Sequence, residues 1–169
     1  MKYLTFILSV NLLFAGCSNT YFIVRHAEKE LASSGSIMLT PGDPALSDGG
    51  KKRAELLKDE LENKKIHYIF STQTRRTQST AAPLSQLSGL KINPYNNDTL
   101  ENFIKRLKSI KKGNVLIVGH SNTVDDIVNK LSGKTQITSD LKDSEYDNLF
   151  VVKRRGNKFS FTRKKYGKD

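Results

Sequence analysis

Two unbroken apolar runs constrain the fold of this chain more than any other feature of its sequence. Residues 21–24 read Tyr-Phe-Ile-Val, and residues 115–118 read Val-Leu-Ile-Val. Neither run alternates apolar with polar side chains, so each is typical of a strand that is buried on both faces in a parallel sheet. Helix-like segments separate the strand-like runs, which predicts helices on both faces of that sheet. The sequence therefore predicts an α/β fold: a three-layer α/β/α sandwich around a largely parallel central sheet.

The other elements follow from the same apolar patterns. Strands are predicted near residues 20–25, 66–70, 89–93 and 114–118, and helices near residues 48–62, 75–87, 98–111 and 122–132. The strand-like segments on either side of Gly156 and Asn157 predict an antiparallel C-terminal hairpin with a two-residue turn. Residues 133–145 have the weakest pattern in the chain.

Both apolar runs end in a histidine. Arg25 and His26 follow the first run, and Gly119 and His120 follow the second. Because the carboxyl ends of parallel strands meet at one edge of a sheet, the two histidines can share a pocket. Neutral histidine is a nucleophile near neutral pH, and a guanidinium group is a fork that fits phosphate oxygens. This pairing predicts phosphoryl-transfer chemistry.

Two further segments strengthen that interpretation. Residues 46–56 predict a helix capped by Ser47 or Asp48, and residues 69–83 place Arg76 and Thr80 on one helix after a strand end. In order and spacing, these four motifs resemble the histidine phosphatase superfamily, which also contains the cofactor-dependent phosphoglycerate mutases. The resemblance runs from about Tyr21 through the final strands.

The resemblance implies roles for four of these residues. His26 would be the catalytic nucleophile, while Arg25, Arg76 and His120 would bind the phosphoryl oxygens. Preorganised cations can stabilise the charge of a phosphoryl group in transfer without a metal. We therefore expect no cofactor and no metal, since the chain has three histidines, one cysteine and no paired ligands at helical spacing.

Two other basic residues are expected outside the pocket. Arg75 would point about 100° away from Arg76 on a helix, so it is expected at the rim or on the surface. His67 lies within the strand-like segment Ile66–Phe70, and its side chain is expected on the less buried face.

The sequence leaves the general acid open among Asp98, Glu101 and Glu28. The resemblance implies either a glutamate between Arg76 and His120 or an aspartate directly after His120, but Ser121 occupies the second position. Asp98 and Glu101 also fit a capping box at a helix start, which is the favoured interpretation. Glu28 is near His26 in sequence and could equally orient Arg25.

The first residues have the layout of a secretory signal. Lys2 precedes an apolar stretch from Leu4 to Phe14, and Leu-Phe-Ala-Gly-Cys at 13–17 resembles a bacterial lipobox. We expect a signal peptide at 1–16, a single domain at 17–169, and lipidation of Cys17. The alternative for Cys17 is a buried free thiol. The expected location is the bacterial cell envelope, lipid-anchored on its periplasmic or extracytoplasmic face.

The formal net charge of +11 favours contact with anions. The basic runs lack a nucleic-acid reading motif or an aromatic stacking platform, so no specific nucleic-acid partner is expected. A solvated basic face is the favoured interpretation. The sequence contains no signal for an oligomeric state.

The favoured function is a metal-independent phosphatase that works through a phosphohistidine on His26. Its substrates would be small phosphorylated compounds, phosphoproteins, or phosphohistidine and acyl phosphates. The alternatives are a non-catalytic, anion-binding surface lipoprotein on the same fold and a phosphoglycerate mutase. The chain is short for the substrate-enclosing segments of a mutase, and export would separate it from cytoplasmic metabolites.

Overall fold

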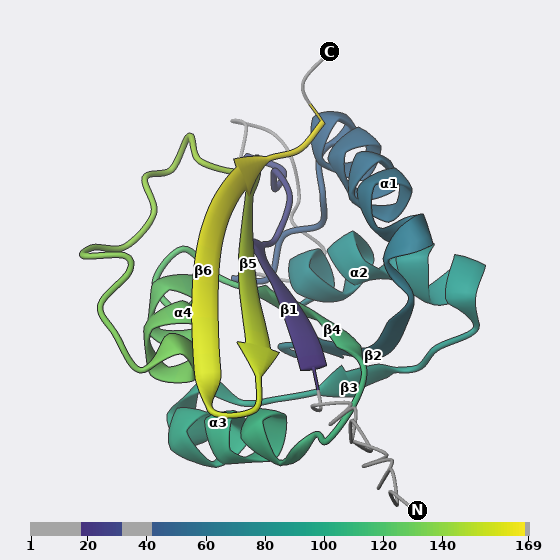
Figure 1. Cartoon of the computed structure of the whole chain (residues 1–169). Helices are drawn as coiled ribbons and strands as arrows, with labels where there is room; N and C mark the ends of the chain where they lie inside the picture. Colours follow the sequence, from purple (N-terminus) through teal and green to yellow (C-terminus); the bar gives the residue numbers. More distant parts are fainter. Residues whose placement is uncertain (1–17, 32–41, 168–169) are drawn as a thin grey trace, which may run out of the picture.

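The computed structural model describes residues 18–31 and 42–167; the expected signal peptide (1–16) and Cys17 lie outside the described residues. Six strands form one mixed sheet in the order β3-β2-β4-β1-β5-β6 (Figure 1). The strands are β1 (Ser18–Arg25), β2 (Ile66–Ser71), β3 (Ile92–Pro94), β4 (Asn114–Gly119), β5 (Asn148–Arg155) and β6 (Lys158–Lys165). The α-helices are α1 (Asp48–Leu61), α2 (Arg75–Ser88), α3 (Leu100–Ser109) and α4 (Val124–Ser132).

The strand directions confirm the predicted sheet. The pairs β1–β4, β2–β4 and β2–β3 are parallel, whereas β1–β5 and β5–β6 are antiparallel. Several boundaries differ by about two residues from the prediction, and two of the differences have a local cause. Strand β3 starts at Ile92 and not at residue 89, because Gly89 has a φ of 69° and ends helix α2. Helix α3 starts at Leu100, after a 3₁₀ turn over Asn97–Thr99.

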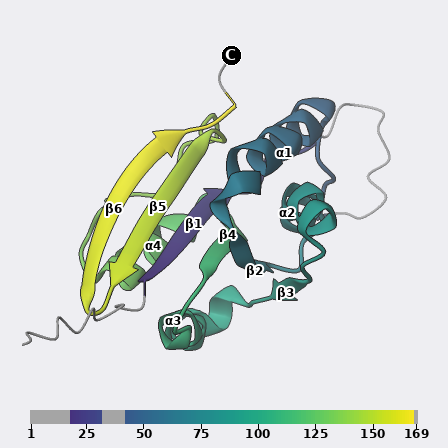
Figure 2. The same ribbon diagram turned by 45° about the vertical axis from the view of Figure 1, so that its right-hand side comes forward.

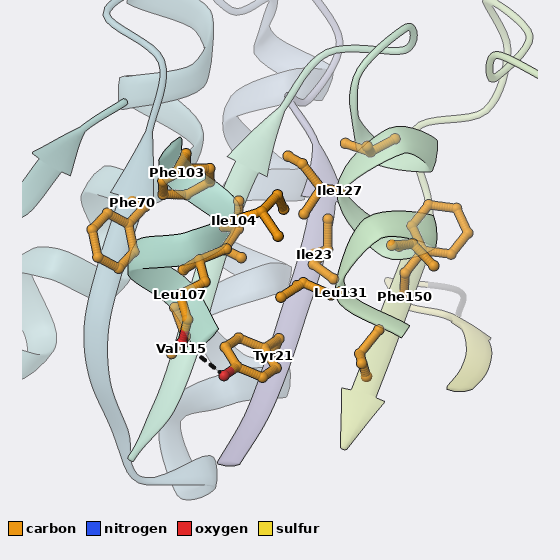
Figure 3. Packing of buried hydrophobic residues seen from close by; sticks show 14 of the residues in the cluster. Tyr21, Ile23, Phe70, Phe103, Ile104, Leu107, Val115, Ile127, Leu131 and Phe150 are labelled. Atoms are coloured by element: carbon orange, nitrogen blue, oxygen red, sulfur yellow. Dashed lines mark hydrogen bonds between the residues drawn. The ribbon is translucent and has the colours of Figure 1, made fainter. Parts of the chain in front are cut away.

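One face of the sheet packs against α3 and α4. Tyr21 and Ile23 of β1 lie on this face, where their side chains meet Leu107 of α3 and Ile127 and Leu131 of α4 (Figure 3). The Tyr21 hydroxyl donates a hydrogen bond of 2.9 Å to the backbone carbonyl of Leu107. The buried hydroxyl group is therefore satisfied by a carbonyl near the end of a helix.

The other face of the sheet packs against α1 and α2, as the rotated view shows (Figure 2). Phe22 and Val24 point to this face, because successive side chains of a strand alternate between faces. Helices on both faces explain why the run at 21–24 contains no polar position. Within the described ranges, no helix is long and apolar enough to cross a membrane.

The loop after β1 is joined tightly to the start of α1. The Ser47 hydroxyl accepts a hydrogen bond of 3.1 Å from the Gly50 N–H and caps α1, as predicted. The Ser47 N–H donates to the carbonyl of Glu28 at 2.9 Å. A Cβ atom on Gly50 would lie only 2.1 Å from that Glu28 carbonyl oxygen, so only glycine fits here.

Gly50→Ala is therefore expected to lower the free energy of unfolding by about 1–3 kcal/mol, because the helix start must move away from the loop. Gly49→Ala is the matched control, since its Cβ would meet only the Ser47 hydroxyl at 3.7 Å. The control should be neutral or gain up to about 1 kcal/mol from better helix propensity. Urea unfolding measures both, and equal effects of the two substitutions would contradict the close approach.

Candidate active site

The strand register brings the two histidines together. Arg25 pairs with Gly119 across the parallel strands β1 and β4, so His26 and His120 each follow a paired residue at the same edge. Their ring centroids are 5.5 Å apart, with an angle of 66° between the ring planes. The expected pocket at the carboxyl ends of the strands is therefore present.

His26 is almost fully buried, with 4% of its surface exposed. Its backbone N–H donates to the Gly119 carbonyl at 2.9 Å, which continues the pairing of β1 with β4 for one more residue. The Nδ1 atom lies 2.8 Å from the carbonyl oxygen of Ala27. Because a carbonyl can only accept, Nδ1 carries the proton, and the lone pair of the neutral ring is on Nε2.

His120 is held between a hydroxyl group and an arginine. Its Nε2 lies 2.9 Å from the Thr72 hydroxyl, and its Nδ1 lies 3.4 Å from a guanidinium nitrogen of Arg76. A guanidinium only donates, so Nδ1 accepts, and the proton of the neutral ring is on Nε2. Thr72 is fixed in turn by a 2.9 Å contact with the Thr77 hydroxyl at the start of α2.

Arg76 faces the pocket from the first turn of α2, and Arg75 does not. The Arg76 guanidinium lies 3.2 Å from Asp43, in addition to its contact with His120. The Arg75 side chain is exposed, as predicted, and its backbone N–H donates to both carboxylate oxygens of Asp43 at 3.0 Å. Asp43 thus accepts from the first N–H of α2 and also forms an ion pair with the Arg76 side chain.

Arg25 approaches the pocket from the end of β1 and is 3% exposed. Its guanidinium donates to the carbonyl of Lys142 at 2.9 Å and lies 3.4 Å from the carboxylate of Asp143. The group also lies over the Tyr146 ring, 4.1 Å from the centroid, and that ring is 6.0 Å from His26. The segment before β5 therefore fixes the orientation of Arg25.

The site keeps both histidines uncharged. Burial lowers the pKa of His26 from its ordinary 6.5 to about 4, and the charges of Arg25, His120 and Arg76 add to this shift. Burial likewise lowers the pKa of His120 to about 4, with further contributions from Arg76 and Arg25. The neighbouring cations lower both pKa values further, but the loss of water has the larger effect. At neutral pH the pocket thus combines an unprotonated Nε2 on His26 with two guanidinium groups.

The three acid candidates all lie in other contacts. Both carboxylate oxygens of Glu28 accept from Arg53, at 2.7 and 2.8 Å. Glu101 pairs with Lys130 of α4 at 2.6 Å, and this hydrogen bond lowers the pKa of Glu101. Asp98 is exposed, and its backbone N–H donates to the Asn96 side chain.

The predicted capping box is wrong. Thr99 is at the N-cap of α3 and makes no capping bond through its side chain, while Asn96 caps the preceding 3₁₀ turn. The extra turn moves Asp98 out of the cap position and Glu101 into the first turn of the helix, where its carboxylate reaches α4.

Four residues at the site were missed in the sequence. Asp43, Thr72, Asp143 and Tyr146 contact Arg76, His120 or Arg25. Asp43 and Thr72 flank predicted elements, so their places at strand and helix ends were a usable signal. Asp143 and Tyr146 lie in or next to the least patterned segment, and their contact with Arg25 spans more than 100 positions.

The third histidine is separate from this site. His67 is exposed on β2, as predicted, and its Nδ1 accepts from the Asn114 N–H at 3.2 Å. Among residues 18–31 and 42–167, no group of three His, Cys, Asp or Glu side chains is arranged to hold a metal ion.

The buried histidines make stability depend on pH. Unfolded histidines take up protons as the pH falls through 6.5, whereas His26 and His120 stay neutral until about pH 4. The contribution of the two neutral histidines to the free energy of unfolding is therefore complete above pH 6.5 and is lost progressively toward pH 4. Between pH 7.5 and 4.5 we expect the pair to account for a loss of at least about 3 kcal/mol in urea unfolding. The double variant His26→Gln/His120→Gln should have a correspondingly flatter pH profile, and an unchanged slope would contradict the assignment.

Comparison with known proteins gives one curated relative. A segment of 70 residues is 37% identical to phosphoserine phosphatase 1 of Hydrogenobacter thermophilus. This segment is 41% of the chain and 33% of that enzyme, so the match spans about a third of the relative's length.

Solved structures share the whole fold. The protein histidine phosphatase SixA, complexed with tungstate, has a TM-score of 0.65 at 16% identity, over 86% of this chain and 96% of that one. The phosphoserine phosphatase of Entamoeba histolytica, complexed with 3-phosphoglyceric acid, has a TM-score of 0.63 at 11% identity. That match covers 89% of this chain and 98% of the other.

A family model matches the first part of the domain. Residues 21–99 match the model of the histidine phosphatase superfamily (branch 1), a segment that contains Arg25, His26 and Arg76. His120 follows outside the matched segment and completes the pocket in three dimensions. The chain is therefore similar to the histidine phosphatase superfamily over residues 21–99, and it shares the fold of the solved phosphatases over 86–89% of its length.

Proposed function

We propose that this protein is a phosphatase that transfers a phosphoryl group to His26 and then to water, without a metal. The observation that carries the proposal is the meeting of a buried, neutral His26 with His120 and two arginines at one edge of the sheet. The similarity to the superfamily supports the same chemistry.

In the proposed first step, the Nε2 lone pair of His26 attacks phosphorus, and the bond from phosphorus to the leaving atom breaks. The electron pair of that bond stays with the leaving group. The Nδ1–H contact with the Ala27 carbonyl orients the ring and stabilises the positive charge that develops on it. In the second step, a water oxygen attacks phosphorus and the bond to Nε2 breaks, which restores neutral His26.

Arg25, Arg76 and His120 would bind the phosphoryl oxygens during both steps. Each arginine has a carboxylate as its present partner: Asp143 for Arg25 and Asp43 for Arg76. A phosphoryl group carries more negative charge than one carboxylate and can compete for both guanidinium groups at once. The Asp143 side chain is fully exposed, so its pair with Arg25 is the easier one to displace.

The proposed substrates have leaving groups that need little help from an acid. Glu28, Glu101 and Asp98 remain candidates for a proton donor, but each makes a contact that accounts for it structurally. The leaving groups of phosphohistidine, acyl phosphates and aryl phosphates depart readily. We therefore propose these substrate classes before alkyl phosphates. The known relatives act on phosphoserine or on protein phosphohistidine, as their names state, which keeps both small molecules and phosphoproteins among the candidates.

Two alternative functions are less well supported. A non-catalytic protein that binds anions would need the same arginines but no unprotonated histidine beside them. The neutral His26 thus favours catalysis. A phosphoglycerate mutase would have to retain the substrate between two transfers, and the export proposed below would separate it from cytoplasmic metabolites.

The first test is covalent labelling. Brief exposure to labelled acetyl phosphate should give an acid-labile, base-stable phosphoenzyme in the parent protein and none in His26→Ala. Arg76→Ala and His120→Ala should each lower turnover by roughly a hundredfold or more, the scale of losing one charge-stabilising donor.

Arg75→Ala and His67→Ala are the matched controls, because they remove the neighbouring arginine and the remaining histidine without touching the pocket. Both should keep near-parental turnover. Labelling that persists in His26→Ala would disprove the nucleophile, and tight phosphate binding without turnover in the parent would favour the non-catalytic alternative.

We also propose that the domain is attached to the outer side of a bacterial membrane through a lipid on Cys17. The support is the sequence of residues 2–17, with its lysine, apolar stretch and lipobox-like end. Cys17 directly precedes β1 in the sequence, whereas His26 follows the opposite end of that strand. The pocket would thus open away from the bilayer, toward soluble substrates.

Cys17→Ser should abolish incorporation of labelled fatty acid and shift the chain out of the processed, membrane-bound fraction. The physical reason is that the thioether to the lipid forms only on the cysteine sulfur. Fatty-acid labelling and membrane fractionation of the parent and the variant in a bacterial host test this prediction. A parent chain that is unlabelled, soluble and still begins at Met1 would overturn this location.

A further inference from the structure

A basic strip runs along one face of the β5–β6 hairpin. Strand alternation and the pairs Lys153–Ser160 and Arg155–Lys158 place these side chains on the same face as Leu149 and Val151. That face also carries α1 and α2, but these helices cover the centre of the sheet and leave the hairpin open (Figures 1 and 2). We define the basic strip as Lys64, Lys153, Arg155, Lys158 and Lys164, of which Lys64 precedes β2.

Most positive charges of the strip have no carboxylate partner within the described residues. All five side chains belong to exposed residues. Within the described parts of the chain, Lys64 has one carboxylate at the 4.0 Å limit, Glu60, and the other four have none within that distance. Exposed ion pairs elsewhere, such as Lys165 with Asp147, show that this surface does form them where carboxylates are available.

Two recesses flank Lys153. One has a volume of about 310 Å³ and is lined by three lysines, one carboxylate and three apolar side chains, among others: Lys64, Lys153, Lys164, Glu60, Phe22, Leu149 and Val151. The second has a volume of about 380 Å³ and is lined by Lys153, Arg155, Lys158, Phe159 and Ser160. A lining that is mostly cationic and partly apolar suits a ligand that has an anionic group joined to hydrocarbon.

The strip lies where the chain enters the domain. Ser18, the first described residue of β1, pairs with Arg155, and Thr20 pairs with Lys153. In Figure 1 the start of β1 and the turn between β5 and β6 lie at the same lower end of the sheet. His26 follows the upper end of β1, so Lys153, Arg155 and Lys158 lie toward the end of that strand that is opposite the catalytic pocket.

We propose that the basic strip binds the anionic phospholipid headgroups of a membrane surface. Two features of the strip favour a lipid over a nucleic acid as its ligand. Apolar side chains line the first recess, and none of the five strip residues is aromatic, whereas nucleic-acid strands are held by stacking on exposed rings. Phe159, which lines the second recess, is half-buried and packs against the core on the other face of the sheet. A surface of this kind adds to a lipid anchor, since one acyl chain alone binds membranes only weakly.

The test uses vesicles and full-length, unlipidated chains of residues 1–169, so that the apolar N-terminal stretch contributes equally to every variant. Sedimentation measures binding to vesicles of phosphatidylcholine alone and of phosphatidylcholine with about 30% phosphatidylglycerol. The triple variant Lys153→Gln/Arg155→Gln/Lys158→Gln removes the charges nearest Ser18. Each basic residue contributes about fivefold to partitioning onto an anionic surface, so the variant should lose at least about thirtyfold on anionic vesicles and nothing on neutral ones.

The matched control removes three exposed lysines elsewhere, as Lys52→Gln/Lys105→Gln/Lys134→Gln, with the same loss of net charge. It should lose less than about fivefold. Circular dichroism melting establishes that both triple variants are folded, and parental binding should weaken at least tenfold between 50 and 250 mM salt.

Two outcomes overturn the proposal. Equal losses in the strip variant and the control variant would mean that net charge alone drives binding. A larger effect of the strip variant on a single-stranded oligonucleotide than on anionic vesicles would assign the surface to nucleic acid. The assay contains no phosphatase step, so its result is independent of the catalytic proposal.

Discussion

The parallel pairing of β1 with β4 is the constraint on which the rest of the molecule depends. Tyr21 to Arg25 pair in register with Val115 to Gly119, and both strands are covered by helices on either face. A one-residue slip would send every side chain of a strand to the opposite face. The register is therefore held by two cores at once, and it sets His26 and His120 side by side. The catalytic geometry is thus a direct consequence of core packing, which suits a site that must be rigid before the substrate arrives.

Burial has two opposite effects at this site, and their balance decides its chemistry. Removal of water disfavours charge on the histidines, which stay neutral, while Arg25 and Arg76 remain charged because guanidinium groups do not deprotonate in proteins. Each arginine is stabilised by nearby oxygen acceptors, Lys142 and Asp143 for one and Asp43 for the other. The result is a pocket with fixed positive charge and two unprotonated imidazole rings, a combination that two histidines in water would not provide at mildly acidic pH.

The two ends of the sheet differ in what they present. The carboxyl ends of β1, β2 and β4 carry the loops that hold the histidines and arginines. The opposite end carries the β5–β6 turn and exposed basic residues beside the first residue of β1. This separation follows from topology, since parallel strands place all their starts at one edge and all their ends at the other. Attachment through the N-terminal side of β1 and catalysis at its far end are therefore geometrically compatible in one small domain.

The sequence by itself determined the element types, the three layers and four of the site residues. Those features depend on local patterns: the apolar runs at 21–24 and 115–118, the helical spacing after Ser47 and Arg75, and polar residues at strand ends. Only the tertiary structure decided which groups surround these four. Asp43, Tyr146 and Thr72 reach the pocket from segments that are distant in sequence, and no local periodicity encodes such contacts. The start of α3 also escaped prediction, because the Asn96 side chain accepts from the Asp98 N–H and caps a 3₁₀ turn that precedes the helix. The charges of Arg25 and Arg76 lower the pKa of His26, and this effect can be argued from the residue types alone. Burial lowers that pKa more, and burial is a property of the assembled fold.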